Sequence, residues 1–232
     1  MPDAARRSFL EVLSGEDRRA LLTRARTIKA RKGQLVLARG EVSRDVFIIL
    51  EGRLEAVIYA ANGREVSLRA LGEGQLFGEL AAIDNEVRSA SIMASTDARL
   101  LVMGQDLFRS VIASSPEATD WLIRRLTAQI RSLTNRVFEL SALRVQARLH
   151  CELVRLARSQ TDDGVVDPAP THSELASRIG THREAVTREL SALARRKIVR
   201  SSRGRLEFLD LEGLEEELRA SLRAPVEEDG GW

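Results

Sequence analysis

The spacing of apolar residues along the chain changes character near residue 116. Before that point, short apolar runs are separated by glycines at positions 33, 40, 52, 63 and 72. Such runs predict β-strands, and Asn62-Gly63 is typical of a hairpin turn. The predicted strands cover 34–37, 45–50, 53–59, 65–71, 89–94 and 98–103. Residues 6–26 instead carry apolar side chains at helical spacing, and Ser14 or Asp17 is expected to cap the second of two short helices.

Many short strands joined by glycine turns favour an antiparallel roll or barrel. A roll needs an apolar filling between its sheets. The residues expected to provide it are Val36, Phe47, Ile49, Leu54, Val57, Leu68, Leu76, Ile92 and Leu101.

A long helix is predicted from Pro116, a residue that suits the first turn of a helix. Apolar residues then recur at alternating spacings of three and four positions, at Ile123, Leu126, Ile130, Leu133, Val137 and Leu140. This narrow seam is typical of a parallel coiled coil, whereas a helix packed on its own domain usually carries a wider stripe. The pattern favours a two-fold symmetric homodimer. The alternative is a core helix with a chance heptad.

The last third of the chain predicts a helix-turn-helix motif. The stripe breaks at 139–144, which we interpret as a hinge, and a turn-rich linker is expected over 161–170. Thr171 to Glu174 predicts a capping box, and Gly180 ends the helix that this box opens. A second capping box is expected at 181–184. The helix after it should turn Val186, Leu190 and Leu193 inward, and a basic hairpin around Gly204 should follow as a wing.

The outward face of this second helix is suited to reading DNA. The N-terminal part of a recognition helix enters the major groove. Arginine can bind guanine through O6 and N7, and glutamate can accept from the cytosine amino group. Arg183, Glu184 and Arg188 therefore predict a half-site with G·C pairs. The full set expected at the DNA is Thr181, His182, Arg183, Glu184, Thr187, Arg188 and Arg203.

Composition limits the functional classes to which the protein can belong. The formal net charge is only +2, but residues 167–208 hold nine lysines and arginines against five acidic residues, a local charge of +4. A basic surface for nucleic acid is thus concentrated there. The single cysteine, Cys151, excludes an internal disulfide and a cysteine-ligated cluster within one chain. No apolar run suits a membrane span or a signal peptide, so we expect a cytoplasmic protein.

Residues 72–92 carry the most specific chemistry of the chain. Backbone N–H groups after Gly78 would open a short helix and favour an anion. Arg88 offers a guanidinium and Ser89 a hydroxyl, both suited to phosphate oxygens. Glu79 would repel a phosphate, but it can accept a hydrogen bond from a ribose hydroxyl. The alternative is that residues 78–80 only begin a helix and that Arg88 lies in a solvated loop.

Two segments resemble those of a known family. Phe77-Gly-Glu-Leu-Ala81 followed by Arg88-Ser-Ala90 resembles the phosphate-binding cassette of cyclic nucleotide-binding domains, and residues 180–188 resemble the recognition segment of Crp/Fnr transcription regulators. The resemblance implies an α+β protein with a β jelly-roll (1–115), a dimerisation helix (116–140) and a winged helix-turn-helix domain (141–232). The residues that it implies at the nucleotide are Gly78, Glu79, Leu80, Ala81, Arg88, Ser89, Leu133 and Thr134.

The long helix departs from the family pattern. Alignment with the best-known member of the family places Leu133 where that protein has a base-contacting threonine, and Thr134 where it has a serine that reaches from the partner chain. Leucine cannot hydrogen-bond the amino group of adenine. Base selection is therefore expected to be weaker here or to favour another nucleotide, with Thr134 still a candidate contact. Cyclic AMP is the effector that the resemblance implies, and cyclic GMP is the alternative.

The resemblance implies a homodimeric, ligand-gated transcription regulator that binds a pseudo-palindromic, double-stranded DNA operator and contacts RNA polymerase. The alternatives are a regulator of the same fold with another effector or none, a redox or haem sensor of the same superfamily, and an enzyme such as a nucleotide hydrolase. Clustered cysteines are lacking, which argues against an iron–sulfur sensor. His150, His172 and His182 do not group with carboxylates at a metal-ligand spacing, so we expect neither a metal site nor an enzyme.

Overall fold

The computed structural model describes residues 8–59, 65–160, 164–202 and 204–223. The chain divides into two compact units, residues 1–132 and residues 133–232. The long helix α5 (Pro116–Ala142) contributes residues to both units. Each unit is built around apolar clusters of its own.

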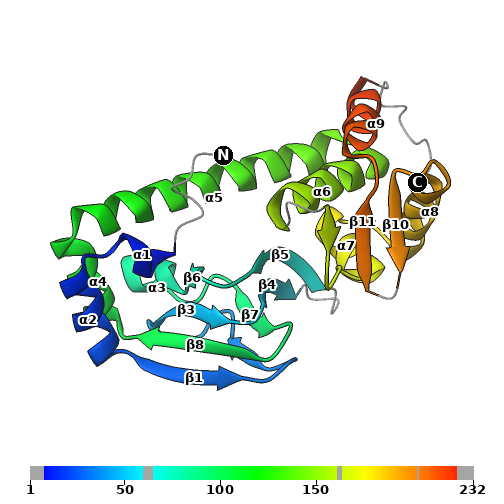
Figure 1. The fold of residues 1–232 in the computed structure, drawn as a ribbon. Helices are drawn as coiled ribbons and strands as arrows, with labels where there is room; N and C mark the ends of the chain where they lie inside the picture. Colours follow the sequence, from blue (N-terminus) through cyan, green and yellow to red (C-terminus); the bar gives the residue numbers. More distant parts are fainter. Residues whose placement is uncertain (1–7, 60–64, 161–163, 203, 224–232) are drawn as a thin grey trace. The chain divides into compact units, whose positions relative to one another are not determined.

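The first unit contains a β-roll of two four-stranded antiparallel sheets (Figure 1), with strand orders β1-β8-β3-β6 and β2-β7-β4-β5. The strands are β1 (Arg26–Ala30), β2 (Leu35–Leu37), β3 (Val46–Glu51), β4 (Leu54–Tyr59), β5 (Glu65–Leu71), β6 (Leu76–Phe77), β7 (Ser91–Ala94) and β8 (Ala98–Met103). The six predicted strands are confirmed. The sequence did not reveal β1, which is mostly exposed and polar, or β6, which has only two residues.

Strand β3 is apolar from Val46 to Leu50 because its two faces line two different cores. Phe47 and Ile49 lie in the core between the sheets, whereas Val46 and Ile48 belong to a second core beneath the helices. Successive residues of a strand point to opposite faces. Leu76 and Leu101 were predicted to fill the core between the two sheets. This prediction was wrong, because both residues belong to the helix-side core.

Five helices contribute to the helix-side core: α1 (Phe9–Val12), α2 (Gly15–Arg24), α3 (Glu79–Asp84), α4 (Gln105–Ser114) and the start of α5. Helices α2 and α4 lie side by side in Figure 1. Ser14 caps α2 as predicted, because its Oγ accepts from the backbone N–H of Asp17 at 3.1 Å. Helix α5 begins at Pro116, and the Oγ of Ser115 accepts from Ala118 N–H at 3.2 Å. Helix α4 was not predicted.

The second unit contains a helix-turn-helix motif and a wing. Its elements after α5 are α6 (Val145–Gln160), β9 (Val165–Val166), α7 (His172–Ile179), α8 (Arg183–Arg195), β10 (Val199–Ser202), β11 (Arg205–Phe208) and α9 (Leu211–Arg223). The wing is a three-stranded antiparallel sheet of order β10-β11-β9. Two of these elements were not predicted: β9, which lies in the expected linker, and α9.

Only one of the two predicted capping boxes forms. Thr171 and Glu174 cap α7 reciprocally, and Gly180 ends that helix in the left-handed conformation. At α8 the N-cap residue is His182, which makes no side-chain capping bond. The Thr181 N–H donates to the carbonyl of Ala176 at 2.9 Å, so Thr181 belongs to the turn. The prediction of a box at 181–184 was therefore wrong.

Ion pairs join the last turns of α5 to α6 and α7 within the second unit. Both carboxylate oxygens of Glu139 accept from Arg155 Nη2, Oε1 at 2.7 Å and Oε2 at 3.0 Å. Arg155 also pairs with the buried Glu152, which in turn pairs with Arg178 at 3.3 Å. Arg136 donates to the backbone carbonyl of Arg178 at 2.6 Å. Helix α5 ends at Ala142 and α6 begins at Val145, so the break between them lies inside the stretch predicted as a hinge.

Candidate functional site

The junction between β6 and α3 (Glu79–Asp84) requires a glycine. Gly78 is the N-cap residue of α3 and has a left-handed backbone with φ of 84°. A Cβ at this position would lie 2.9 Å from Nη1 of Arg88 and 2.9 Å from the carbonyl oxygen of Asp45. Only glycine combines this conformation with so close an approach. The cassette helix is therefore held directly against Arg88.

Arg88 is buried, with only 3% of its surface exposed, and it is fixed by three hydrogen bonds. Its Nε donates to Ser43 Oγ at 2.9 Å, its Nη1 to the carbonyl of Gly78 at 2.8 Å, and its Nη2 to the carbonyl of Asp45 at 2.7 Å. Each terminal nitrogen keeps a second N–H for another acceptor. Burial lowers the pKa of Arg88, while Glu41, Asp45 and Glu79 act to raise it. The guanidinium is thus oriented but retains donors.

Glu79 is the first residue of α3 and is as deeply buried as Arg88. Its carboxylate forms no direct ion pair with any residue that the structure describes. The charge of Glu79 nevertheless acts to raise the pKa values of Arg69, Arg88 and Arg125. A buried carboxylate without a hydrogen-bonding partner is costly, so this group is poised to accept from a hydroxyl.

The other predicted cassette residues differ in exposure. Ala81 is buried on α3, whereas Leu80 and Ser89 are exposed. The structure thus brings Gly78, Glu79 and Arg88 together and leaves the Ser89 side chain accessible beside them.

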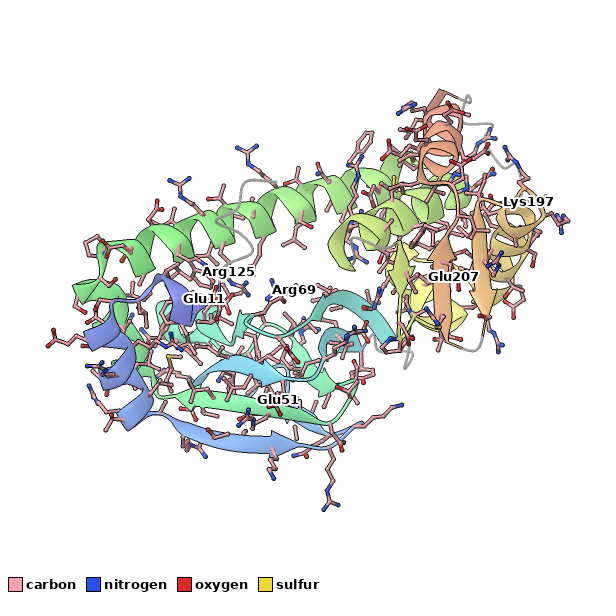
Figure 2. All side chains as sticks on the ribbon, in the orientation of Figure 1. Glu11, Glu51, Arg69, Arg125, Lys197 and Glu207 are labelled. Atoms are coloured by element: carbon pink, nitrogen blue, oxygen red, sulfur yellow. The ribbon has the colours of Figure 1, made fainter. Side chains whose placement is uncertain are left out.

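Helix α5 brings two residues to this site that the sequence reasoning missed. Arg125 donates to the backbone carbonyl of Leu76, and its guanidinium lies 5.5 Å from the centre of the Trp121 ring. Gln129, with its amide oxygen turned toward Arg69, accepts from both terminal nitrogens of that arginine. Figure 2 shows the side chains of Arg125 and Arg69 near each other, on the side of α5 that faces the roll.

Leu133 and Thr134, the predicted base contacts, fall in the second unit, and the Leu133 side chain is exposed. The one indication of Arg125 and Gln129 in the sequence is that they lie one turn apart on α5. Many other polar residues lie between the apolar positions of this helix, so the pair does not stand out. Spacing alone could not show which turn of the helix lies beside the cassette.

The recognition helix α8 turns a polar face outward. Val186, Leu190 and Leu193 are buried as predicted. Arg183, Glu184 and Arg188 are exposed, and their side chains have no partner among the residues that the structure describes. The hydrogen-bonding groups of these three side chains are available to base edges in the major groove of DNA.

The remaining predicted DNA contacts differ in setting. Thr187 donates to the carbonyl of Arg183 at 3.0 Å and lies 2.8 Å from Nδ1 of His172, so its hydroxyl joins α8 to α7. His182 is exposed at the start of α8, and Thr181 is half-buried in the turn. Arg203 lies outside the described residues.

The wing and the C-terminal end of α8 carry arginines that are paired with acidic residues. Arg200 pairs with Glu207 at 3.0 Å, and Arg205 lies 3.5 Å from Asp167. Arg196, which follows α8, pairs with Glu217 of α9. Among the described residues, basic side chains without an acidic partner lie at both ends of α8: Arg183 and Arg188 in its first turns, and Arg195 and Lys197 at and just after its end.

Comparison with known proteins identifies a domain in each half of the chain. Residues 27–115 match the cyclic nucleotide-binding domain family, and residues 147–217 match the Crp-like helix-turn-helix domain. A CRP-like cAMP-activated global transcriptional regulator of Mycobacterium tuberculosis is 32% identical over 185 residues, which cover 78% of this chain and 83% of that protein. This chain belongs to the Crp/Fnr family of transcription regulators.

Other members of the Crp/Fnr family are similar over comparable lengths. The cyclic AMP receptor protein of Thermus thermophilus is 30% identical over 80% of this chain and 84% of its own length. The crystal structure of a CRP/FNR family transcriptional regulator from the same organism matches with a TM-score of 0.68 and 28% identity, over 84% of this chain and all of that one. The predicted α+β architecture, with its roll, long helix and helix-turn-helix domain, is confirmed.

Membership of the family settles the broad class of function. The regulator has a cyclic nucleotide-binding domain and a DNA-binding domain, and it is not an enzyme. Within the described residues, no helix combines the length and apolar character that a membrane span needs, and no group of histidine, cysteine and acidic side chains could hold a metal ion.

Proposed function

We propose that this regulator is a homodimer whose sequence-specific binding to DNA is gated by a cyclic nucleotide. The observation that carries the proposal is the pair formed by Glu79 and Arg88, which are both buried beside Gly78. One retains an unpaired acceptor and the other retains unused donors. A cyclic nucleotide supplies the hydroxyl and the anionic phosphate that these two groups lack.

The residues of the cassette fit such a ligand. The hydrogen bonds that fix Arg88 leave one N–H free on each terminal nitrogen, and Ser89 adds an accessible hydroxyl. The backbone N–H groups of Glu79, Leu80 and Ala81 lie in the first turn of α3, where they have no partner within the helix. Cyclic AMP, for which two relatives are named, and cyclic GMP both carry the required phosphate and 2′-hydroxyl.

Dimerisation is proposed from the seam on α5. Ile123, Ile130, Leu133, Val137 and Leu140 all have exposed side chains in the single chain. An exposed apolar seam of this length is unfavourable in water and marks an interface. Its heptad spacing favours a second copy of the same helix. Leu126 is an exception, because it packs partly against the helix-side core of its own unit.

DNA recognition is proposed for the start of α8. In a two-fold dimer, two copies of Arg183, Glu184 and Arg188 would face successive major grooves roughly 34 Å apart. Such a dimer reads a pseudo-palindromic operator, and these side chains favour G·C pairs in each half-site. Thr181, His182, Thr187 and Arg203 complete the proposed contacts. RNA polymerase is a further proposed partner, as the family resemblance implies.

In the proposed arrangement the roll (1–115) holds the nucleotide. Residues 139–144 act as the hinge between the dimerisation helix (116–140) and the winged helix-turn-helix domain (141–232). Binding of an effector changes DNA affinity only if the effector prefers one of two conformations. A shift from 1:99 to 99:1 takes about 5.5 kcal/mol of differential binding. The ion pair between Glu139 and Arg155 joins α5 to α6 across this stretch. It is a contact that can form in one conformation and break in the other.

Calorimetric titration of the full chain with cyclic AMP and cyclic GMP tests the proposed site. Glu79→Gln keeps the shape of the side chain and removes its charge, so we expect the affinity for nucleotide to fall by about tenfold or more. Glu86→Gln is the matched control, because Glu86 is an exposed acid in the loop between α3 and Arg88. Arg88→Ala is less diagnostic, because it also removes donors from two backbone carbonyls.

The proposal fails if the unaltered protein binds neither nucleotide. The assignment of Glu79 fails if Glu79→Gln and Glu86→Gln bind with equal affinity.

A further inference from the structure

Two arginines lie on the α5 side of the cassette, in addition to Arg88. Arg69 comes from β5 and Arg125 from α5, and the charges of the two act on each other. Arg125 is held by the carbonyl of Leu76 and by the Trp121 ring, yet its Nε is buried without a hydrogen-bonding partner among the described residues. A buried N–H donor of this kind is uncommon in a folded protein and calls for an acceptor.

The charges on this side of the cassette do not balance. Arg88 has Glu41 and Asp45 beside it as well as Glu79. For Arg69 and Arg125, Glu79 is the acidic residue whose charge acts on both. Burial lowers the pKa of Arg69, and it lowers the pKa of Arg125 to about 10. Two partly buried cations thus share one carboxylate, which favours an electron-rich group of a ligand at this place.

Gln129 completes a polar edge that contains only donors. Its amide oxygen must face Arg69, because the opposite orientation would bring amide N–H groups against guanidinium N–H groups. The oxygen accepts from Nη1 and, at 3.2 Å, from Nη2 of Arg69. With its one acceptor occupied, Gln129 can offer a ligand only its NH₂ group. The Arg69–Gln129 edge therefore presents N–H donors and no acceptor.

We infer that the Arg69–Gln129 edge, supported by Arg125, selects a cyclic nucleotide whose base is guanine. The O6 and N7 atoms of guanine form an edge with two acceptors, which matches an edge made only of donors. Adenine carries an amino group beside N7, and that N–H would meet other N–H donors. This inference rests on the proposed function, because it names the base of the ligand that Glu79 and Arg88 hold.

Calorimetric titration of the full chain with cyclic GMP and with cyclic AMP tests the inference. The two ligands share phosphate and ribose, so the ratio of their dissociation constants reports the base alone. We expect cyclic GMP to bind on the order of 10- to 100-fold more tightly, the discrimination expected of a well-matched base edge. In Arg69→Leu and in Gln129→Leu this ratio should fall toward one.

Two further variants separate recognition from folding. Arg69→Lys keeps N–H donors at the same place and should retain part of the preference for cyclic GMP. Arg99→Leu, which alters an exposed arginine of the roll paired with Glu51, should leave the ratio unchanged. A loss of stability alone would lower both affinities without changing their ratio.

The possible outcomes are distinct. Equal or tighter binding of cyclic AMP to the unaltered protein would overturn the inference while leaving nucleotide binding intact. A preference for cyclic GMP that survives both Arg69→Leu and Gln129→Leu would overturn the assignment to this edge. If the unaltered protein bound neither nucleotide, the proposed function itself would fail.

Discussion

At the scale of single residues, the site depends on one position, Gly78, where a side chain does not fit. Gly78 has a left-handed backbone and lies against Arg88 and the carbonyl of Asp45. The sequence predicted that Gly78, Glu79 and Arg88 act together, because their residue types and spacing match a phosphate-binding cassette. It did not reveal Arg69, Arg125 or Gln129. The packing of α5 on the roll decides which turn of this helix lies beside the cassette, and the spacing of residues along the chain does not show that packing.

The substitution Gly78→Ala tests whether the junction between β6 and α3 requires a glycine. An alanine must adopt an unfavourable backbone conformation and place its Cβ against a backbone carbonyl that cannot move freely. We expect the free energy of unfolding to fall by about 2–4 kcal/mol, measured by urea denaturation of the β-roll. Gly72→Ala is the control, because a Cβ at Gly72 would meet no atom within 4 Å and its effect should stay below about 1 kcal/mol. Equal losses in the two variants would contradict this account of Gly78.

At the scale of elements, apolar periodicity predicted most of the strands and helices that face a core, but not the helices α4 and α9. It failed for β1, which exposes most of its residues, and for the short strands β6 and β9. These three are held by pairing with neighbouring strands, and pairing leaves little trace in an apolar pattern. The seam on α5 was visible in the sequence for a different reason. Its residues are apolar although the single chain leaves most of them exposed.

The substitution Val137→Asp tests whether this seam is a dimer interface. Val137 is exposed in the single chain, so an aspartate there costs the monomer little. In a dimer the two charges would be buried close together without a partner, and the dissociation constant should rise by at least about 100-fold. Sedimentation equilibrium measures this change. Asn135→Asp is the matched control, because it adds the same charge at an exposed position of α5 outside the seam. A wild-type protein that is monomeric at micromolar concentration would contradict the dimer.

At the scale of the whole molecule, the proposed function requires that two surfaces act together. The first unit holds Glu79 and Arg88, and the second presents Arg183, Glu184 and Arg188. The order of the two domains along the chain was predicted from motifs, because each motif is local in sequence. The coupling between the domains leaves no such local pattern. It depends on which of two conformations a ligand prefers, and that preference is an energy difference rather than a sequence feature.

The affinity of the full chain for an operator duplex, with and without cyclic nucleotide, tests this coupling most directly. The duplex is selected from randomised DNA, and binding is followed by fluorescence anisotropy at one fixed salt concentration. Saturating nucleotide should tighten binding by about 5- to 150-fold, the usual range of a coupling free energy between two sites. Glu79→Gln should shift this response to higher nucleotide concentrations. An operator affinity that is the same with and without a nucleotide shown to bind would contradict the account.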